Sequence, residues 1–170
     1  MTFLATGLGL RAASLGSSTP NYASAYLSFH FLFAYCVLAP RHLKQLWGLD
    51  HQSSPREDLV KYGDAAVKSG RITQKQLNML KRNEGAQANS VENYALLVGA
   101  MGFATFAGVK PEIVNRAGLV YTAARIAYGI SYILIEDNLW AVSRSVFWWV
   151  GNGSCLWLFW EAGKLLKSGN

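Results

Sequence analysis

Residues 22–39 read YASAYLSFHFLFAYCVLA, and this stretch indicates the class of the protein. Its eighteen residues carry no formal charge, and Pro40 and Arg41 close it. A helix needs about 20 predominantly apolar residues to cross the hydrocarbon core of a bilayer. We therefore predict that this segment spans a membrane, with its flanks extending the helix into the headgroup region.

Three further apolar segments follow, at about residues 88–109, 117–135 and 145–162. None shows the wide polar face that a surface helix of a soluble protein needs, so a soluble bundle with apolar core helices is the disfavoured alternative. We predict an all-α integral membrane protein, a four-helix bundle formed by a single domain over residues 1–170. The first twenty residues contain Arg11 and a Ser/Gly/Thr/Pro stretch, and predict a flexible or interfacial N-terminus rather than a fifth span.

The composition agrees with a membrane protein. Apolar residues make up 51% of the 170 residues and charged residues 15%, whereas a typical soluble domain is about 25% charged. A soluble monomer of this length buries only about 70% of its surface, and so few charges would cover the remainder poorly. Cys36 and Cys155 both lie in apolar runs, which excludes a disulfide scaffold.

Most of the net charge of +6 lies in the segment 40–85, between the first two predicted spans, which holds nine Lys/Arg and five Asp/Glu. Lys and Arg near a membrane mark the cytosolic side, so we predict that this loop is cytosolic and that both termini lie opposite. Because acidic residues alternate with the basic ones, no nucleic-acid partner is expected. Residues 71–83 predict a helix capped by Thr73 that leads into the second span.

The candidate functional residues are the polar ones that interrupt the spans. An ionisable group at bilayer depth costs about 2.5–3.5 kcal/mol on insertion scales, and normally faces a partner or a water-filled cavity. Within the second and third spans these residues are three or four positions apart, which places each group on one helical face. In a four-span topology most of them fall in the cytosolic half, which predicts a polar pocket open to the cytosol. They are Asn89, Glu92 and Asn93, then Tyr121, Arg125, Tyr128 and Tyr132, then Arg144 and Ser145.

Each of these residues also has a plainer interpretation. Glu92 and Arg125 can form a structural ion pair that fixes helix register. Tyr128 and Tyr132 can be interfacial aromatic residues, and Arg144 can be a flanking arginine whose guanidinium reaches the headgroups. No His/Cys/Asp/Glu cluster has the spacing of metal ligands, so no metal is predicted.

In their order, three motifs resemble the membrane-associated proteins in eicosanoid and glutathione metabolism. They are Asn-x-x-Glu at 89–92, Arg-x-x-aromatic-x-x-x-Tyr at 125–132, and Arg-Ser at 144–145, and the likeness covers about residues 81–166. The resemblance implies four transmembrane helices and a homotrimer with active sites between neighbouring subunits on the cytosolic side. It also implies the endoplasmic reticulum, glutathione as cofactor and a lipophilic substrate.

The resemblance also assigns roles to residues. Asn89 and Glu92 would hold the glutathione backbone, Tyr132 would bind on the third span, and Arg144 with Ser145 would stabilise the thiolate. An adjacent guanidinium or hydroxyl donor lowers the pKa of a thiol and so creates the nucleophile. The full predicted set is Arg144, Ser145, Tyr132 and Tyr128 for catalysis, and Asn89, Glu92, Arg82, Arg125, Gln87 and Trp148 for cofactor binding.

The chain departs from the family pattern at several positions. Gly85 and Ala88 stand where glutathione-using members with mammalian-type motifs carry arginines, and Trp148 stands where a tyrosine is expected. Arginines are the natural bidentate partners of the two glutathione carboxylates, so Arg82 and Arg41 are the candidate replacements. Asn115, which also belongs to the resemblance, is interpreted as a loop or helix-start residue.

Three functions are consistent with these residues. The first is a glutathione-dependent membrane transferase or isomerase acting on a lipophilic electrophile. The second is an enzyme that isomerises or cyclises a hydrophobic metabolite without glutathione, by acid–base chemistry of Tyr128, Tyr132, Glu92 and Arg144. The third is a non-catalytic membrane partner of other proteins. For the long 40–85 loop, a role as an interfacial lid over the pocket is a further hypothesis.

Overall fold

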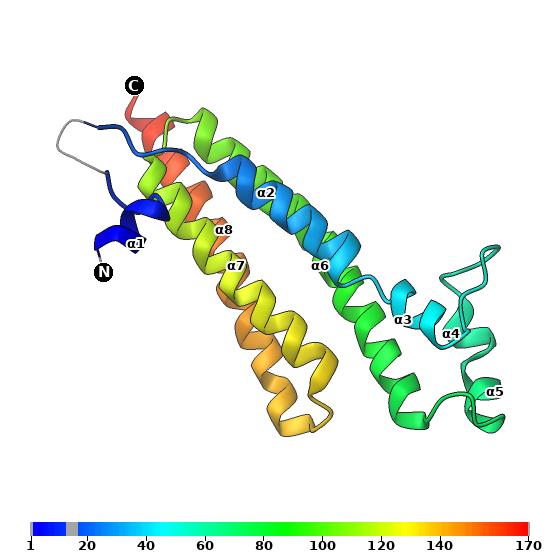
Figure 1. The fold of residues 1–170 in the computed structure, drawn as a ribbon. Coiled ribbons are helices and arrows are strands. Elements are labelled where there is room, and N and C mark those ends of the chain that lie inside the picture. Colours follow the sequence, from blue (N-terminus) through cyan, green and yellow to red (C-terminus); the bar gives the residue numbers. More distant parts are fainter. Residues whose placement is uncertain (1, 13–16, 170) are drawn as a thin grey trace.

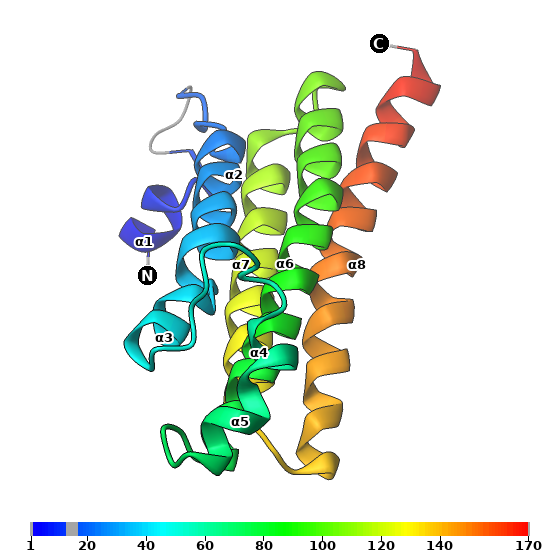
Figure 2. The same ribbon diagram turned by 90° about the vertical axis from the view of Figure 1, so that its right-hand side faces the viewer.

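The computed structural model describes residues 2–12 and 17–169, and within them the only regular structure is helical, as the sequence predicted. The elements in chain order are α1 (Thr2–Gly7), α2 (Ala23–Leu32), the π-helix η1 (Phe33–Val37), α3 (Arg41–Leu46), α4 (Asp58–Lys61), α5 (Gly63–Lys68), α6 (Gln74–Phe106), α7 (Pro111–Leu134) and α8 (Asn138–Ser168). The long helices α6, α7 and α8 pack side by side, and α2 lies along α6 and α7 (Figures 1 and 2).

Among the described residues, two helical segments are long and apolar enough to cross a membrane, Ala23–Leu46 and Pro111–Leu134. They cover the first and third predicted spans except for one terminal residue of each. The second and fourth lie inside α6 and α8, which extend well beyond them and include polar turns. The membrane crossing of α6 and α8 therefore remains a prediction.

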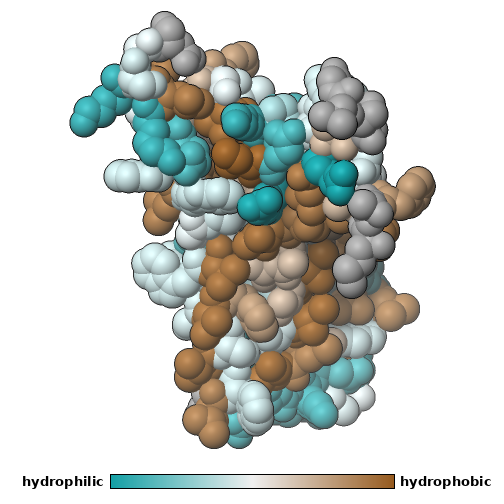
Figure 3. Space-filling model, turned by 90° about the vertical axis from the view of Figure 1, so that its left-hand side faces the viewer, coloured by the Kyte–Doolittle hydropathy of each residue, from teal (hydrophilic) through white to brown (hydrophobic). Residues whose placement is uncertain are grey.

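The helix surface is rich in exposed apolar side chains. Phe106, Trp149 and Trp160 are 93%, 62% and 68% exposed. On the face drawn in Figure 3, apolar side chains occupy the middle and hydrophilic ones gather toward the ends. Contiguous apolar surface of this kind fits a lipid environment or contact with another chain.

The first span is fastened to α7 through close packing and one polar contact. A Cβ atom added at Gly118 of α7 would lie 2.4 Å from Cδ2 of Tyr26 on α2, so only glycine allows this approach. One helical turn further on, His30 Nε2 and Thr122 Oγ1 share a hydrogen bond of 3.0 Å. These contacts fix α2 against the helix that carries Arg125, Tyr128 and Tyr132.

Side chains define where α6 and α8 begin. The Thr73 Oγ1 accepts a hydrogen bond from the Gln76 backbone N–H, while the Gln76 side chain accepts one from the Thr73 N–H, forming a capping box. The predicted cap at Thr73 is confirmed. At α8, the carboxylate of Asp137 accepts from the N–H groups of Leu139 and Trp140.

Helix α7 begins six residues before the predicted span, with Pro111 in its first turn, where a missing N–H costs nothing. Asn115 therefore lies inside the helix instead of in a loop, and it is fully buried. Its Oδ1 accepts from the Tyr22 N–H at 2.8 Å, and its Nδ2 donates to the carbonyls of Gly9 and Pro20, both at 2.8 Å. The described N-terminal residues are thus tied to α7, although composition suggested a flexible or interfacial segment.

The segment predicted as a long loop is a small folded unit, which we call the 41–84 unit. It comprises α3, α4, α5 and the first turns of α6, and it lies beside the N-terminal end of α6 (Figure 1). It has an apolar core of its own, formed by Leu49, Leu59, Ala66, Ile72, Leu77 and Leu80.

Candidate functional site

The predicted polar stripe on α7 forms a ladder in which two tyrosine rings lie between two guanidinium groups. The Arg125 guanidinium lies 4.6 Å from the centre of the Tyr128 ring, and the Tyr128 and Tyr132 rings are 5.3 Å apart. The Arg144 guanidinium, from α8, lies 4.6 Å from the centre of the Tyr132 ring. The four residues form the Arg–Tyr ladder, and the prediction that the α7 positions share one face is confirmed.

Arg125 is 1% exposed, at the inner end of the ladder. Its Nη2 donates to Asn89 Oδ1 at 3.1 Å and to Ser90 Oγ at 3.2 Å, whereas Nη1 has no hydrogen-bond partner among the described residues. Ser90 had not been singled out from sequence. The sequence feature that could have indicated Ser90 is its small hydroxyl side chain directly after the predicted site residue Asn89.

The alternative of a Glu92–Arg125 ion pair is wrong for this structure. Glu92 is exposed, and Arg125 is bonded to neutral groups instead. Asn93 shares the inner face with Asn89, because its Nδ2 donates to the Asn89 carbonyl and side-chain oxygens, both at 3.1 Å. Three residues make less than one helical turn, so Glu92 lies at the edge of the face that Asn89 and Asn93 share.

Arg144 closes the outer end of the ladder at the first turns of α8. Its Nη2 donates to the Ile135 carbonyl, and its buried Nε has no hydrogen-bond partner among the described residues. Within that part of the chain no carboxylate lies within ion-pair distance of Arg125 or Arg144. The ladder thus carries two cations and unused N–H donors without a protein anion.

Helix α6 approaches the ladder at Gly85. A Cβ atom added there would lie 3.0 Å from Cε1 and Oη of Tyr132. The tyrosine ring occupies the space that a larger side chain at this position would need. This packing gives a structural reason for glycine at a position where the family pattern suggested arginine.

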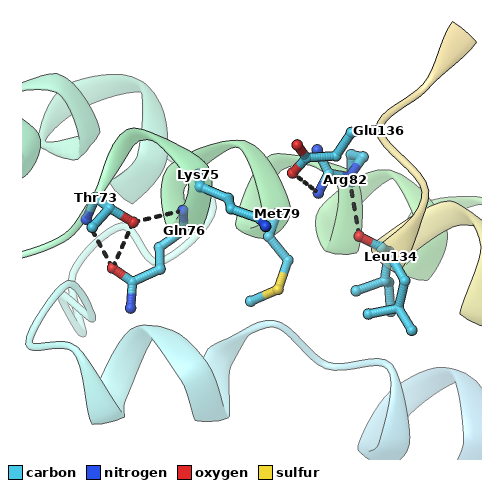
Figure 4. A pocket seen from close by; sticks show the side chains of 8 residues that line it. Thr73, Lys75, Gln76, Met79, Arg82, Leu134 and Glu136 are labelled. Carbon is cyan, nitrogen blue, oxygen red and sulfur yellow. Dashed lines mark hydrogen bonds and ion pairs between the residues drawn. The ribbon is translucent and has the colours of Figure 1, made fainter.

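Two of the predicted cofactor-binding residues have partners within the chain. Arg82 Nε donates to the Ile133 carbonyl at 3.1 Å, and its Nη2 pairs with Glu136 at 2.8 Å (Figure 4). These contacts border a cavity of about 280 Å³ between α6 and the α7–α8 connection. Gln87 Nε2 donates to the Ala34 carbonyl of η1 at 3.4 Å, which links the first span to α6.

Ser145 and Trp148 follow Arg144 on α8. Ser145 is exposed, and Trp148 packs edge-on against Trp149 with ring centres 4.8 Å apart. The predicted set is therefore divided between the ladder with Asn89, the helix contacts of Arg82 and Gln87, the exposed Glu92 and Ser145, and the half-buried Trp148. The residues described contain no group of His, Cys, Asp or Glu that could hold a metal ion.

Chemically, the ladder suits the stabilisation of an anion. A guanidinium donates strong, directional hydrogen bonds to thiolate or carboxylate groups, and the phenols of Tyr128 and Tyr132 can donate as well. In surroundings of low polarity such donors act more strongly than in water.

Comparison with known protein families agrees with this geometry. The model of the MAPEG family matches residues 20–164. The chain belongs to the MAPEG family. MAPEG proteins are a membrane family that includes glutathione transferases and isomerases, and its members commonly use glutathione. The resemblance inferred from the motifs at 89–92, 125–132 and 144–145 is thereby confirmed.

The other comparisons add no individual relative. No curated protein and no solved structure matched the chain. The MAPEG assignment therefore identifies the membrane class and its range of chemistry, while the particular reaction has to be argued from the site.

Proposed function

We propose that the chain is a membrane-embedded, glutathione-dependent transferase or isomerase that acts on a lipophilic electrophile. The observation that carries this proposal is the Arg–Tyr ladder, whose two guanidiniums have unused N–H donors and no protein anion. An uncompensated cation is costly at membrane depth, so such a site is suited to an anionic ligand.

In this mechanism Arg144 would hold the thiol of glutathione. The guanidinium stabilises the thiolate over the thiol, which raises the concentration of the nucleophile at neutral pH. Tyr132 holds Arg144 from the opposite side by a cation–π contact, and Ser145 is a second candidate donor. Transfer forms a sulfur–carbon bond to the electrophile and expels its leaving group. Isomerisation returns the thiol after rearrangement.

The remaining predicted residues hold the rest of the cofactor. Asn89 and Arg125 bind at the inner end of the ladder, where their mutual bond of 3.1 Å already orients both groups. Glu92 would meet the ligand from its exposed position, and Gln87 and the half-buried Trp148 would contact it from beside their own helix contacts.

We further propose a homotrimer with its sites between neighbouring subunits, in the endoplasmic reticulum, and with the 41–84 unit cytosolic. The exposed apolar side chains of the long helices, such as Phe106, Trp149 and Trp160, support this assembly, because contiguous apolar surface fits contact with another chain. Cross-linking in native membranes tests it, and a species that remains monomeric at all cross-linker concentrations argues against sites between subunits.

The experiment uses the full chain purified in detergent. Glutathione binding is measured by calorimetry, together with turnover of an aryl halide electrophile. Arg144→Ala is compared with Arg116→Ala, which removes an exposed arginine at the other end of α7. We expect saturable binding and turnover in the wild type, weaker binding and slower turnover at neutral pH in Arg144→Ala, and no change in Arg116→Ala.

A second function is supported by Gly85, where the Tyr132 ring fills the space of a family arginine. With fewer arginines to bind the glutathione carboxylates, an enzyme that does not use glutathione becomes the alternative. In it the phenols of the Arg–Tyr ladder would isomerise or cyclise a hydrophobic metabolite by acid–base chemistry. In that case glutathione does not bind, yet Arg144→Ala still abolishes a product in cells. If neither binding nor any product depends on Arg144, both catalytic functions are refuted and a non-catalytic membrane partner is supported.

A further inference from the structure

A second cavity borders α6 where the end of the first span meets the 41–84 unit, and it reaches Glu92 at the edge of the face that carries Asn89. Its volume is about 640 Å³, within the range of small-molecule sites. Its lining includes charged and amide side chains from three parts of the chain, namely Arg41, Lys44, Arg56, Glu84, Gln87 and Glu92.

Two of the three cations at this cavity are already paired. Arg41 contacts Asp50 at 3.3 Å and donates to Gln52 at 2.6 Å. Lys44 is 3% exposed and pairs with Glu84 at 3.1 Å and with Asp58 at 3.7 Å. Their charge is therefore compensated within the unit.

Arg56 differs from both. It lines the cavity and is exposed, and no hydrogen bond or ion pair joins its side chain to another described residue. The same holds for the Glu92 carboxylate on the α6 wall. One free cation and one free anion thus border the same cavity.

A buried network fixes the backbone beside Arg56. The Lys44 ammonium donates to the carbonyl of Pro55, the residue immediately before Arg56. Asp58, which is fully buried, holds Lys44 from one side and accepts from His51 at 2.8 Å on the other. Because the backbone is held in place, only the Arg56 side chain has to be ordered when it meets a ligand in the cavity.

We propose that Arg56 binds a carboxylate of the ligand and so supplies part of the anion recognition that Gly85 and Ala88 cannot. This inference rests on the proposed function, in which the carboxylate belongs to glutathione. A guanidinium matches a carboxylate in a bidentate arrangement, and the free Glu92 favours a ligand that also carries an ammonium group, as glutathione does. A lipophilic acid would offer the same carboxylate chemistry without the ammonium.

The test compares wild type, Arg56→Ala and Arg56→Lys, with Lys68→Ala as the matched control. Lys68 is an exposed cation of the same unit that does not line the cavity. Calorimetry of the detergent-purified full chain measures binding of glutathione, of its diethyl ester, in which both carboxylates are masked, and of oleate.

We expect Arg56→Ala to weaken glutathione binding about tenfold, as for loss of one charge-assisted contact, with Arg56→Lys between it and the wild type. Binding of the diester should be the same in wild type and Arg56→Ala, and Lys68→Ala should match the wild type for every ligand. An equal loss for glutathione and its diester would show that Arg56 does not recognise a carboxylate.

The outcomes separate this inference from the proposed function. If glutathione binds the wild type and Arg56→Ala equally well, the role of Arg56 is refuted and the proposed function stands. If only oleate binds, and needs Arg56, the carboxylate site is supported and the glutathione proposal is refuted. If the folded wild type binds neither ligand, both are refuted.

Discussion

Replacement of Arg144 by alanine should raise the pKa of enzyme-bound glutathione thiol. A thiolate at about 4 Å from a guanidinium gains about 4 kcal/mol at an effective dielectric constant near 20, equivalent to about three pKa units. Arg144 is only partly buried, and Arg125 remains in the variant, so the expected rise is nearer to about two units.

The consequence for turnover depends on pH. Less thiolate forms in the variant, but each thiolate is more nucleophilic, because nucleophilicity rises with thiol pKa with a coefficient of about 0.4–0.5. If the wild-type thiol titrates near neutrality, the two effects combine to a loss of about tenfold near pH 6. The deficit should disappear near about pH 8 and reverse at more alkaline pH, where both proteins hold thiolate and that of the variant is more nucleophilic.

The assay is aryl halide turnover across pH, with ultraviolet absorbance of the bound thiolate as a second readout. Arg116→Ala should follow the wild type in both. A loss that is uniform across pH, with an unshifted thiolate titration, would mean that Arg144 serves only folding or binding, and the reasoning on thiol activation would be refuted.

Three further predictions concern the architecture around the site. Asn115→Ala removes a fully buried amide and leaves three backbone groups unpaired, so the free energy of unfolding should fall by about 3 kcal/mol. Thermal denaturation in detergent measures this, and an unchanged midpoint would show that the N-terminal attachment contributes nothing to stability. A Cβ atom at Gly102 would meet no atom within 4 Å, so Gly102→Ala should stabilise α6 by about 1 kcal/mol. Gly85→Ala should stabilise it less, because the Tyr132 ring must shift, and an equal gain in stability for both variants would contradict the close packing at Gly85. Thr73→Ala should destabilise the start of α6 by about 1 kcal/mol and speed hydrogen exchange of the amides in its first turn. Thr73→Ser, which keeps a capping hydroxyl, should exchange as slowly as the wild type, and identical exchange in both variants would contradict the cap.

The sequence predicted the features that depend on local pattern. The first span, the cap at Thr73 and the common face of Arg125, Tyr128 and Tyr132 follow from apolar length, capping preference and helical spacing. Each of these is decided within a few residues of the chain, so one sequence suffices. For the same reason the family motifs could be recognised before the fold was known.

Features that depend on distant contacts were missed. Asn115 binds backbone groups about a hundred residues away, and nothing near it in the sequence indicates them. The 41–84 unit has its own core because short apolar segments meet in space. The alternative of a Glu92–Arg125 pair is wrong because helix register brings Asn89, and not Glu92, to the guanidinium.

The most direct test of the proposed function is calorimetric titration of the purified wild-type protein with glutathione, beside Arg144→Ala and Arg116→Ala. The Arg–Tyr ladder predicts saturable binding to wild type and Arg116→Ala, and clearly weaker binding to Arg144→Ala. Absence of binding to a folded wild-type protein, or equal binding to all three, would contradict a glutathione site built on Arg144.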